Sequence, residues 1–377
     1  MNEEQAEAVL VSPEPFERVS VIGGGAWGTA LAMTAFSAGR RTRLWVREPH
    51  AVEAIRDTRH NPFLPNHPLD PAIGVSPDLA EAVDGADLVI LVVPSQFLRR
   101  VATEVEAHLA SGVPVVVCSK GIETDSGALM TRVVAEAMPG RPHAVLSGPS
   151  FAEEVAAGQP TAVTIASSDA REDDPDAFAA SLAARVAVTL GTGTFRPYLS
   201  DDVVGVEVGG AVKNVLAIAC GIAKGLGLGS NPRAALITRG LAEIKRLAEA
   251  LGGRRETVTG LAGIGDLTLT CSSEQSRNFS FGKALGEGRS AEDILSGTTA
   301  VVEGAVNARS VTALARRLGV EMPICEAVDA VLHEGVPLQE AVQALLTRPI
   351  RAEPREMEPL VRLPHPAAEM NEPQTTP

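Results

Sequence analysis

A glycine-rich run near the start of the chain has the spacing of a phosphate-binding turn. The segment GGGAWG, residues 23–28, matches G-x-G-x-x-G directly after an apolar run and at the start of a helical pattern. The first glycine allows the tight bend, the second lets a pyrophosphate approach the backbone, and the third lets helix and strand pack closely. The helix N-terminus then offers N–H groups to the phosphates. The run predicts a dinucleotide site formed by Gly23, Gly25, Ala26, Trp27 and Gly28.

The end of the second apolar run carries the residue that would discriminate between the two nicotinamide dinucleotides. Arg47 stands about 20 residues after the glycine run, where NAD-selective enzymes tend to place an acidic residue against the ribose 2′-hydroxyl. An arginine at this place instead accommodates the 2′-phosphate of NADP. We therefore expect NADP or NAD as the cofactor, with a lean towards NADP that the adjacent Glu48 makes modest.

A lysine inside an apolar stretch is the next chemical signal. Lys213 lies in GGAVKNVLAIACGIAKG, where a charged side chain is normally excluded. Lowering its pKa from about 10.4 to near 7 takes roughly 4–5 kcal/mol from burial and like-charged neighbours. Lys120, which follows a predicted strand in SKGIE, could be such a neighbour and could also contact substrate oxygens. A lysine that merely extends from the helix to solvent is the alternative reading of Lys213 alone.

These residues need a rigid frame, and the apolar pattern predicts one. Short β-branched runs alternate with helical patterns through the first half, which indicates parallel strands covered on both faces by helices. From about residue 203 the chain is rich in Ala, Leu and Gly, and we find no convincing strand there. The expected fold is α/β: an N-terminal Rossmann-type doubly wound sheet followed by an all-helical C-terminal domain. The expected strands are residues 19–23, 42–46, 88–93, 114–119, 143–147 and 161–167.

The change of pattern also predicts the domain organisation. We expect a dinucleotide-binding domain over residues 18–202 and a helical substrate domain over residues 203–349. Residues 1–17 and 350–377 are rich in Glu and Pro, which predicts a disordered extension and a disordered tail.

The composition disfavours several kinds of partner. A formal net charge of −14 disfavours nucleic acid, whose affinity comes mostly from phosphate contacts, and requires that an anionic substrate meet a local basic cluster. The four cysteines form no CxxC pair and the seven histidines no metal motif, so we expect no metal and a reducing compartment. The acidic N-terminus is no signal peptide, and no apolar run approaches the length of a membrane span. We therefore expect a cytoplasmic protein.

Motifs along most of the chain closely resemble those of one family. In order they include GGGAWGTALA, VPSQ, SKGIE, SGPSFAEEVAAGQPTAV, GGAVKNVLAIACGIAKGLGLG, NPRAALITRGLAEI, GLAGIGDLTLTC, SSEQSRNFSFG and VVEG. Together they resemble the bacterial-type NAD(P)-dependent glycerol-3-phosphate dehydrogenases over about residues 19–345. The resemblance implies interconversion of sn-glycerol 3-phosphate and dihydroxyacetone phosphate by hydride transfer. It also implies a supply of glycerol 3-phosphate for glycerophospholipid synthesis, and a homodimer.

The resemblance assigns roles to residues of the second half. Lys213 matches the family's general base, and Asp266 matches a ligand of the substrate hydroxyl that could also orient Lys213. The family's phosphate-binding positions match Ser276, Arg277 and Asn278, and Arg277 also matches a residue that contacts the cofactor in the family. Arginine suits this role because its planar fork matches phosphate oxygens.

Further positions complete the site that the resemblance implies. Lys120, Gly148 and Ser150 match positions that contact the substrate, and Lys120 also matches a cofactor contact together with Ala152, Val301 and Glu303. The stretch SSEQ, residues 272–275, predicts a capping box at the start of the helix that carries the phosphate-binding residues.

Two other functions share parts of this pattern. A different two-domain dehydrogenase, of the 3-hydroxyacid or 6-phosphogluconate type, would have the same fold. A dinucleotide-binding sensor without catalysis would keep the glycine run but could lose the base. The joint presence of Lys120, Lys213 and Asp266 favours an enzyme over the sensor.

Overall fold

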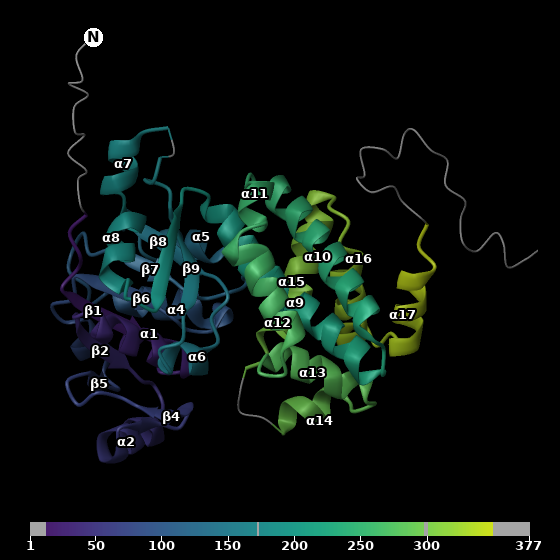
Figure 1. The fold of residues 1–377 in the computed structure, drawn as a ribbon, viewed down its shortest axis with the longest axis horizontal. Helices are drawn as coiled ribbons and strands as arrows, with labels where there is room; N and C mark the ends of the chain where they lie inside the picture. The colour runs from purple at the N-terminus through teal and green to yellow at the C-terminus, as the bar shows by residue number, and fades with distance from the viewer. Residues whose placement is uncertain (1–12, 172, 298–300, 350–377) are drawn as a thin grey trace, which may run out of the picture.

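The computed structural model describes residues 13–171, 173–297 and 301–349 of the chain. Two halves lie side by side: a sheet with helices around it, and a bundle of helices (Figure 1). The first half comes from the N-terminal part of the chain and the second from the C-terminal part, which confirms the predicted fold class.

Eight strands form a single sheet in the order β10-β9-β8-β7-β6-β1-β2-β5. Neighbouring strands pair in parallel, except β8 and β9, which pair antiparallel. The strands of the sheet are β1 (Arg18–Ile22), β2 (Arg41–Trp45), β5 (Gly74–Ser76), β6 (Leu88–Leu91), β7 (Val115–Val117), β8 (His143–Ser147), β9 (Thr161–Ser167) and β10 (Phe195–Ser200). A separate antiparallel pair consists of β3 (His60–Asn61) and β4 (Leu64–Pro68).

Each of the six predicted strand segments contains a strand, and β8 and β9 have the predicted bounds. The sequence pattern missed the hairpin β3–β4 and the two edge strands of the sheet, β5 and β10. β5 has only three residues, and β10 contains Pro197, a residue that strands tolerate mainly at a sheet edge.

Alternate residues of the central strands enter two different cores, so helices cover both faces of the sheet. Leu88 and Ile90 of β6 pack in one core with residues of α1 and α8. Val89 and Leu91 pack in the other core with residues of α4 and α5. The helices of this half are α1 (Ala26–Ser37), α2 (Pro49–Thr58), α3 (Leu79–Val83), the 3-10 turn η1 (Ser95–Phe97), α4 (Leu98–Glu106), α5 (Met130–Ala137), α6 (Ala152–Ala156), α7 (Pro175–Ala180) and α8 (Leu182–Leu190).

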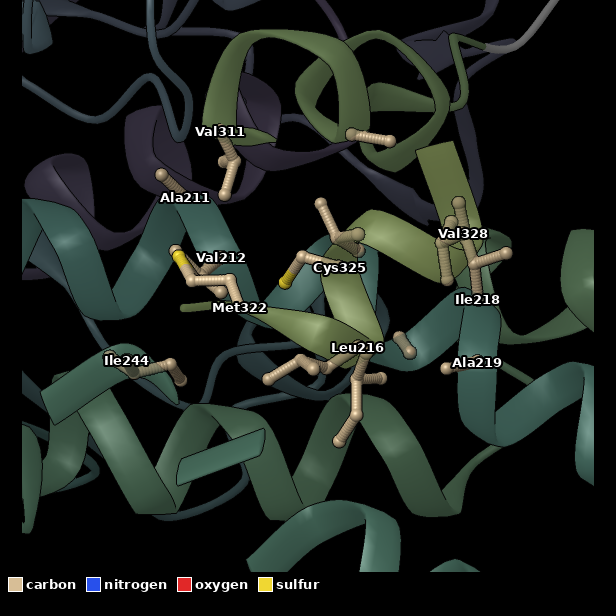
Figure 2. Packing of buried hydrophobic residues seen from close by; sticks show 14 of the residues in the cluster. Ala211, Val212, Leu216, Ile218, Ala219, Ile244, Val311, Met322, Cys325 and Val328 are labelled. Atoms are coloured by element: carbon tan, nitrogen blue, oxygen red, sulfur yellow. The ribbon is translucent and has the colours of Figure 1, made fainter. Parts of the chain in front are cut away.

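In the second half, the long helix α9 runs through the centre of the bundle. Among residues 203–297 and 301–349 there is no strand. Figure 2 shows Val212 and Leu216 of α9 packed among Ile244 of α10 and Cys325 and Val328 of α16. The helices are α9 (Val203–Gly225), α10 (Ser230–Ala250), α11 (Arg255–Val258), the π-helical turn η2 (Leu261–Gly265), α12 (Asp266–Ser272), α13 (Arg277–Gly286), α14 (Ala291–Ser296), α15 (Glu303–Leu318), α16 (Pro323–His333) and α17 (Leu338–Leu346).

The expectation that no apolar run approaches membrane-span length is wrong for α9. By length and composition this helix could cross a membrane, but 83% of its most apolar stretch is buried inside the protein. α10, α12, α13 and α15 all pack against it. The sequence criterion therefore detects the central core helix of a bundle.

Helices α9 and α13 meet backbone to backbone. Gly221 and Gly225 of α9 face Gly282 and Gly286 of α13, and a Cβ atom at any of the four would collide with the backbone of the other helix. Glycine permits this close approach because it has no side chain. The contact fixes how far α13 lies along α9, and therefore where the first residues of α13 stand.

The change from sheet to bundle falls between Ser200, where β10 ends, and Val203, where α9 begins. The domain boundary at residue 202 stays a prediction. Of the predicted extension, residues 13–17 are described, and Phe16 in it is buried and donates its N–H to Thr189 Oγ1 at 2.9 Å. Residues 1–12 and 350–377 lie outside the described residues, so the expected disorder of the two ends stays a prediction.

Candidate active site

The glycine run forms the turn between β1 and α1. Gly23 has a φ of 129°, which favours glycine, and a Cβ at Gly28 would collide with the carbonyl oxygen of Gly23. A Cβ at Gly25 would meet no protein atom within 4 Å. Packing therefore demands the outer two glycines, while the middle one leaves open space in front of the α1 N-terminus. This is the fit expected for a pyrophosphate against the backbone. Ala26 and Trp27 form the first turn of α1 beside that space.

Arg47 lies just beyond the end of β2, the strand that pairs with β1. Its side chain is exposed and binds its neighbour Glu48, with Nε at 3.0 Å and Nη2 at 2.7 Å from Glu48 Oε1. The carboxylate thus binds two of the three nitrogens of the guanidinium group that would receive a 2′-phosphate.

Three charged side chains from distant parts of the chain meet in one cluster. Lys213 Nζ lies 2.6 Å from Asp266 Oδ1, and Lys120 Nζ lies 2.7 Å from Asp266 Oδ2. Lys213 comes from the middle of α9, Asp266 from the first residue of α12, and Lys120 from the loop after β7. Asp266 and Lys213 are buried and Lys120 is nearly so. The sequence prediction that Lys120 is the like-charged neighbour of Lys213 is consistent with this geometry.

Burial and charge determine how these groups hold protons. Burial lowers the pKa of Lys213 to about 8, and the like charge of Lys120 adds to this while Asp266 opposes it. Burial alone would raise the pKa of Asp266, but the two ammonium groups outweigh it and hold that pKa below its ordinary value. The cluster therefore combines an ionised carboxylate with a lysine that can lose its proton near neutral pH.

The π-helical turn η2 places Asp266 beside α9. Gly209 of α9 packs against the backbone of this turn, and a Cβ there would lie 2.6 Å from the carbonyl oxygen of Ala262. Thr270, one turn after Asp266, accepts from Lys213 Nζ at 2.8 Å and donates to Asp266 Oδ1 at 3.2 Å. Sequence reasoning missed Thr270, although a hydroxyl four residues after a functional carboxylate on a helix was a usable signal.

A network of two side-chain amides and one carboxyl group adjoins the cluster. Asn278 donates from Nδ2 to Asn214 Oδ1 at 2.9 Å and accepts from the N–H of Gly304 at 2.8 Å. Asn214 in turn donates to Glu303 Oε2 at 3.3 Å. Burial raises the pKa of Glu303, and the charges of Arg277 and the two lysines oppose that rise. Asn214 was also missed, although it directly follows Lys213 in the same motif.

The predicted capping box at residues 272–275 is wrong. Ser272 is the last residue of α12, and α13 begins at Arg277 with Ser276 as its N-cap, whose hydroxyl accepts from the N–H of Phe279. A serine starts the helix as expected, but it is Ser276, four residues after Ser272, because a short turn separates α12 from α13. Arg277 is exposed, and its side chain makes no hydrogen bond or ion pair with any other described residue.

The remaining predicted residues come from the loop after β8, the start of α6 and the segment before α15. The carbonyl of Gly148 accepts from Lys120 Nζ at 3.2 Å and from Ser150 Oγ at 3.0 Å, which ties the end of β8 to the cluster. Ala152 is the first residue of α6, and Val301 is exposed just before α15. Within the described ranges, no group of three His, Cys, Asp or Glu side chains is placed to hold a metal ion.

A dinucleotide-type turn in a doubly wound sheet, with a buried lysine–carboxylate–lysine cluster against a helical half, defines a two-domain dehydrogenase. The family models for the NAD-dependent glycerol-3-phosphate dehydrogenase N-terminus and C-terminus match residues 18–173 and 202–343. The chain therefore belongs to the NAD-dependent glycerol-3-phosphate dehydrogenase family.

Individual relatives agree with the family models. The chain is 53% identical over 338 residues to the glycerol-3-phosphate dehydrogenase (NAD(P)+) of Rhodospirillum rubrum, covering 89% of this chain and 94% of that protein. It is 54% identical over 339 residues to the enzyme of the same name from Caulobacter vibrioides, covering 90% and 99%. The crystal structure of glycerol-3-phosphate dehydrogenase from Coxiella burnetii superposes with a TM-score of 0.82 at 41% identity, covering 88% of this chain and 99% of that one.

Proposed function

We propose that this protein interconverts sn-glycerol 3-phosphate and dihydroxyacetone phosphate with NAD or NADP, and that Lys213 is its general base. The observation that carries the proposal is the cluster of Lys213, Asp266 and Lys120. It brings a lysine of lowered pKa next to an ionised carboxylate, beside the half of the protein that carries the glycine-rich turn. The names of the relatives support the same substrate and cofactors.

Proton transfer is the part of the reaction that the protein supplies. When bound, the nicotinamide accepts the hydride from C2 of glycerol 3-phosphate or donates it to the ketone. Neutral Lys213 accepts the proton of the C2 hydroxyl during oxidation, and protonated Lys213 returns it to the ketone oxygen during reduction. Asp266 holds Lys213 in place, and the positive charge of Lys120 favours negative charge that develops on the substrate oxygen.

The substrate phosphate requires a positive site of its own. We assign this role to Arg277, with Ser276 and Asn278 beside it, because its guanidinium is exposed at the α13 N-terminus near Glu303 and the cluster. Backbone N–H groups at this helix start favour an anion as well. Gly148 and Ser150 would line the substrate, while Ala152, Val301 and Glu303 would line the nicotinamide end of the cofactor.

Arg47 supports a preference for NADP, and Glu48 limits it. Two of the guanidinium nitrogens bind the Glu48 carboxylate, so a 2′-phosphate would compete with that carboxylate for them. We propose use of both cofactors with NADP favoured. We also propose a homodimer in the cytoplasm that supplies glycerol 3-phosphate for glycerophospholipid synthesis, as the family resemblance implies.

The direct test is steady-state reduction of dihydroxyacetone phosphate with NADPH and NADH separately, beside a panel of 3-hydroxyacids and 6-phosphogluconate in the oxidative direction. Turnover of the triose phosphate pair alone is the expected result. Turnover of a panel member instead would identify a different two-domain dehydrogenase. Binding of NADPH without turnover of any substrate would indicate a dinucleotide sensor.

A further inference from the structure

Helix α15 carries a buried amide that the proposed reaction does not use directly. Asn307 is fully buried, one turn after Glu303. Its Nδ2 donates to the backbone carbonyl of Lys120 at 3.1 Å and to that of Ala211 at 3.4 Å. Lys120 lies in the loop after β7, and Ala211 lies two residues before Lys213 on α9. One side chain therefore links three segments that meet at the charged cluster.

The partners of Asn307 define how its amide is oriented. Both are carbonyl oxygens, which only accept, so the NH₂ group must face them. The amide oxygen is buried, lies on the side of Gly121, and accepts no hydrogen bond from the described residues. The contact with the loop is close, because a Cβ at Gly121 would lie 2.8 Å from Asn307 Oδ1. The backbone at residues 120–121 thus rests directly on this side chain.

The carbonyl that Asn307 holds belongs to a residue of the cluster. Lys120 lies in a segment that is neither helix nor strand, so no regular backbone pairing fixes it. Its Nζ contacts Asp266 Oδ2 and the Gly148 carbonyl at 2.7 and 3.2 Å. A change in the position of this backbone would carry the ammonium group with it and weaken both contacts.

We infer that Asn307 is a positioning residue: it holds the backbone of Lys120 against α9, so that the Lys120 ammonium stays on Asp266 beside Lys213. The inference rests on the proposed function, since that reaction needs both ammonium groups at one carboxylate. Asn307 itself touches no reacting atom in this assignment. Its role is to hold the loop after β7, in the sheet half, at a fixed position against α9 of the bundle.

The test compares Asn307→Ala with Thr312→Val. Thr312 lies on the same helix, is equally buried, and its hydroxyl has no hydrogen-bond partner among the described residues, so the control removes a buried polar group without touching Lys120. One readout is kcat and KM for dihydroxyacetone phosphate over a pH series. The other is the titration of Lys213 by NMR of lysine-labelled protein. The chain has five lysines, at 120, 213, 224, 245 and 283, so the spectra are simple.

In Asn307→Ala we expect kcat to fall about 10-fold or more, with a smaller change in KM, because small misplacements in a site are costly. The pKa of Lys213 should rise, because the Lys120 ammonium would lie farther away. In the parent, the like charge of Lys120 lowers this pKa, while the nearby carboxylates of Asp266 and Glu303 raise it. Asn307→Ser, which keeps one donor, should recover part of both effects. It also provides the comparison if the alanine variant does not fold.

The inference would be overturned if Asn307→Ala and Thr312→Val had the same kinetic constants and the same pKa of Lys213. A parent protein without activity on the triose phosphate would refute the proposed function instead. The NMR titration would still decide the role of Asn307, because it needs no turnover.

Discussion

The influence of Lys120 on Lys213 can be tested by replacing Lys120 with methionine. The change removes the ammonium charge and keeps a side chain of similar length, so Lys213 loses its like-charged neighbour and keeps Asp266. The pKa of Lys213, about 8 in the parent, should therefore rise.

The size of that rise follows from the geometry of the shared carboxylate. Two ammonium groups bound to the two oxygens of one carboxylate lie about 5 Å apart, which gives a repulsion of about 3 kcal/mol at an effective dielectric constant of about 20. One unit of pKa corresponds to about 1.36 kcal/mol, so the pKa of Lys213 should reach about 10 in the variant. At pH 8 the neutral fraction of Lys213 would fall from about one half to about one in a hundred.

The assay is kcat/KM for glycerol 3-phosphate oxidation across the pH range. Oxidation needs neutral Lys213, so the parent profile should rise with pH and level off above about 8. The Lys120→Met profile should still be rising near pH 10, apart from a general loss of activity because a substrate contact is gone. Reduction of the ketone needs protonated Lys213 and should fall with pH across the same ranges.

A matched control removes a positive charge elsewhere. Lys283→Met takes away an ammonium on α13 that pairs with Glu274 at 2.9 Å, and its profile should coincide with that of the parent. An inflection in Lys120→Met at the same pH as in the parent would refute the electrostatic argument, whatever the loss of rate.

The remaining predictions concern the base, the phosphate site and the cofactor. Lys213→Ala should reduce turnover by about 10²–10⁴ with cofactor affinity nearly unchanged, measured by NADPH fluorescence; turnover close to the parent value would reject the base. Arg277→Ala should lower kcat/KM for dihydroxyacetone phosphate at least about 10-fold. It should also reduce the preference for this substrate over dihydroxyacetone, which has no phosphate. If the ratio of kcat/KM between the two ketones stayed unchanged, the phosphate would bind elsewhere. Glu48→Gln should raise the preference for NADPH over NADH in both Kd and kcat/KM, since it frees Arg47; equal effects on both cofactors would contradict this. Gly25→Val should weaken cofactor binding with little change in Tm, because its side chain would enter open space; normal binding would exclude the proposed pyrophosphate position.

The elements that follow a strong local pattern could be predicted from the sequence. The strands of the doubly wound sheet are continuous apolar runs, and β8 and β9 were predicted to the residue. The edge strand β10 has mixed polarity and contains Pro197, so its pairing depends on β9 rather than on its own composition. The start of α13 was misplaced because Ser272 and Ser276 both suit a helix start.

The residues of the site also differ in whether the sequence alone could reveal them. Lys213 was recognisable because a lysine in an apolar helix is unusual. Asn307 carries no such signal, because its role depends on a carbonyl 187 residues away in the chain. Thr270 could have been recognised from its place four residues after Asp266, whereas the partners of Asn214 become evident only when α13 and α15 are packed on α9.

The glycine contact between α9 and α13 has a consequence for how this protein tolerates mutation. Where side chains separate two helices, a larger residue on one can be offset by a smaller residue on the other, and the core adapts. Between Gly221, Gly225, Gly282 and Gly286 there is no side-chain layer to exchange, so no second substitution can compensate for the first. We expect the apolar residues of the bundle to accept many replacements over evolutionary time while these four positions accept almost none. The distance from Asn278 to Asn214 is thus shielded from the drift of the surrounding core.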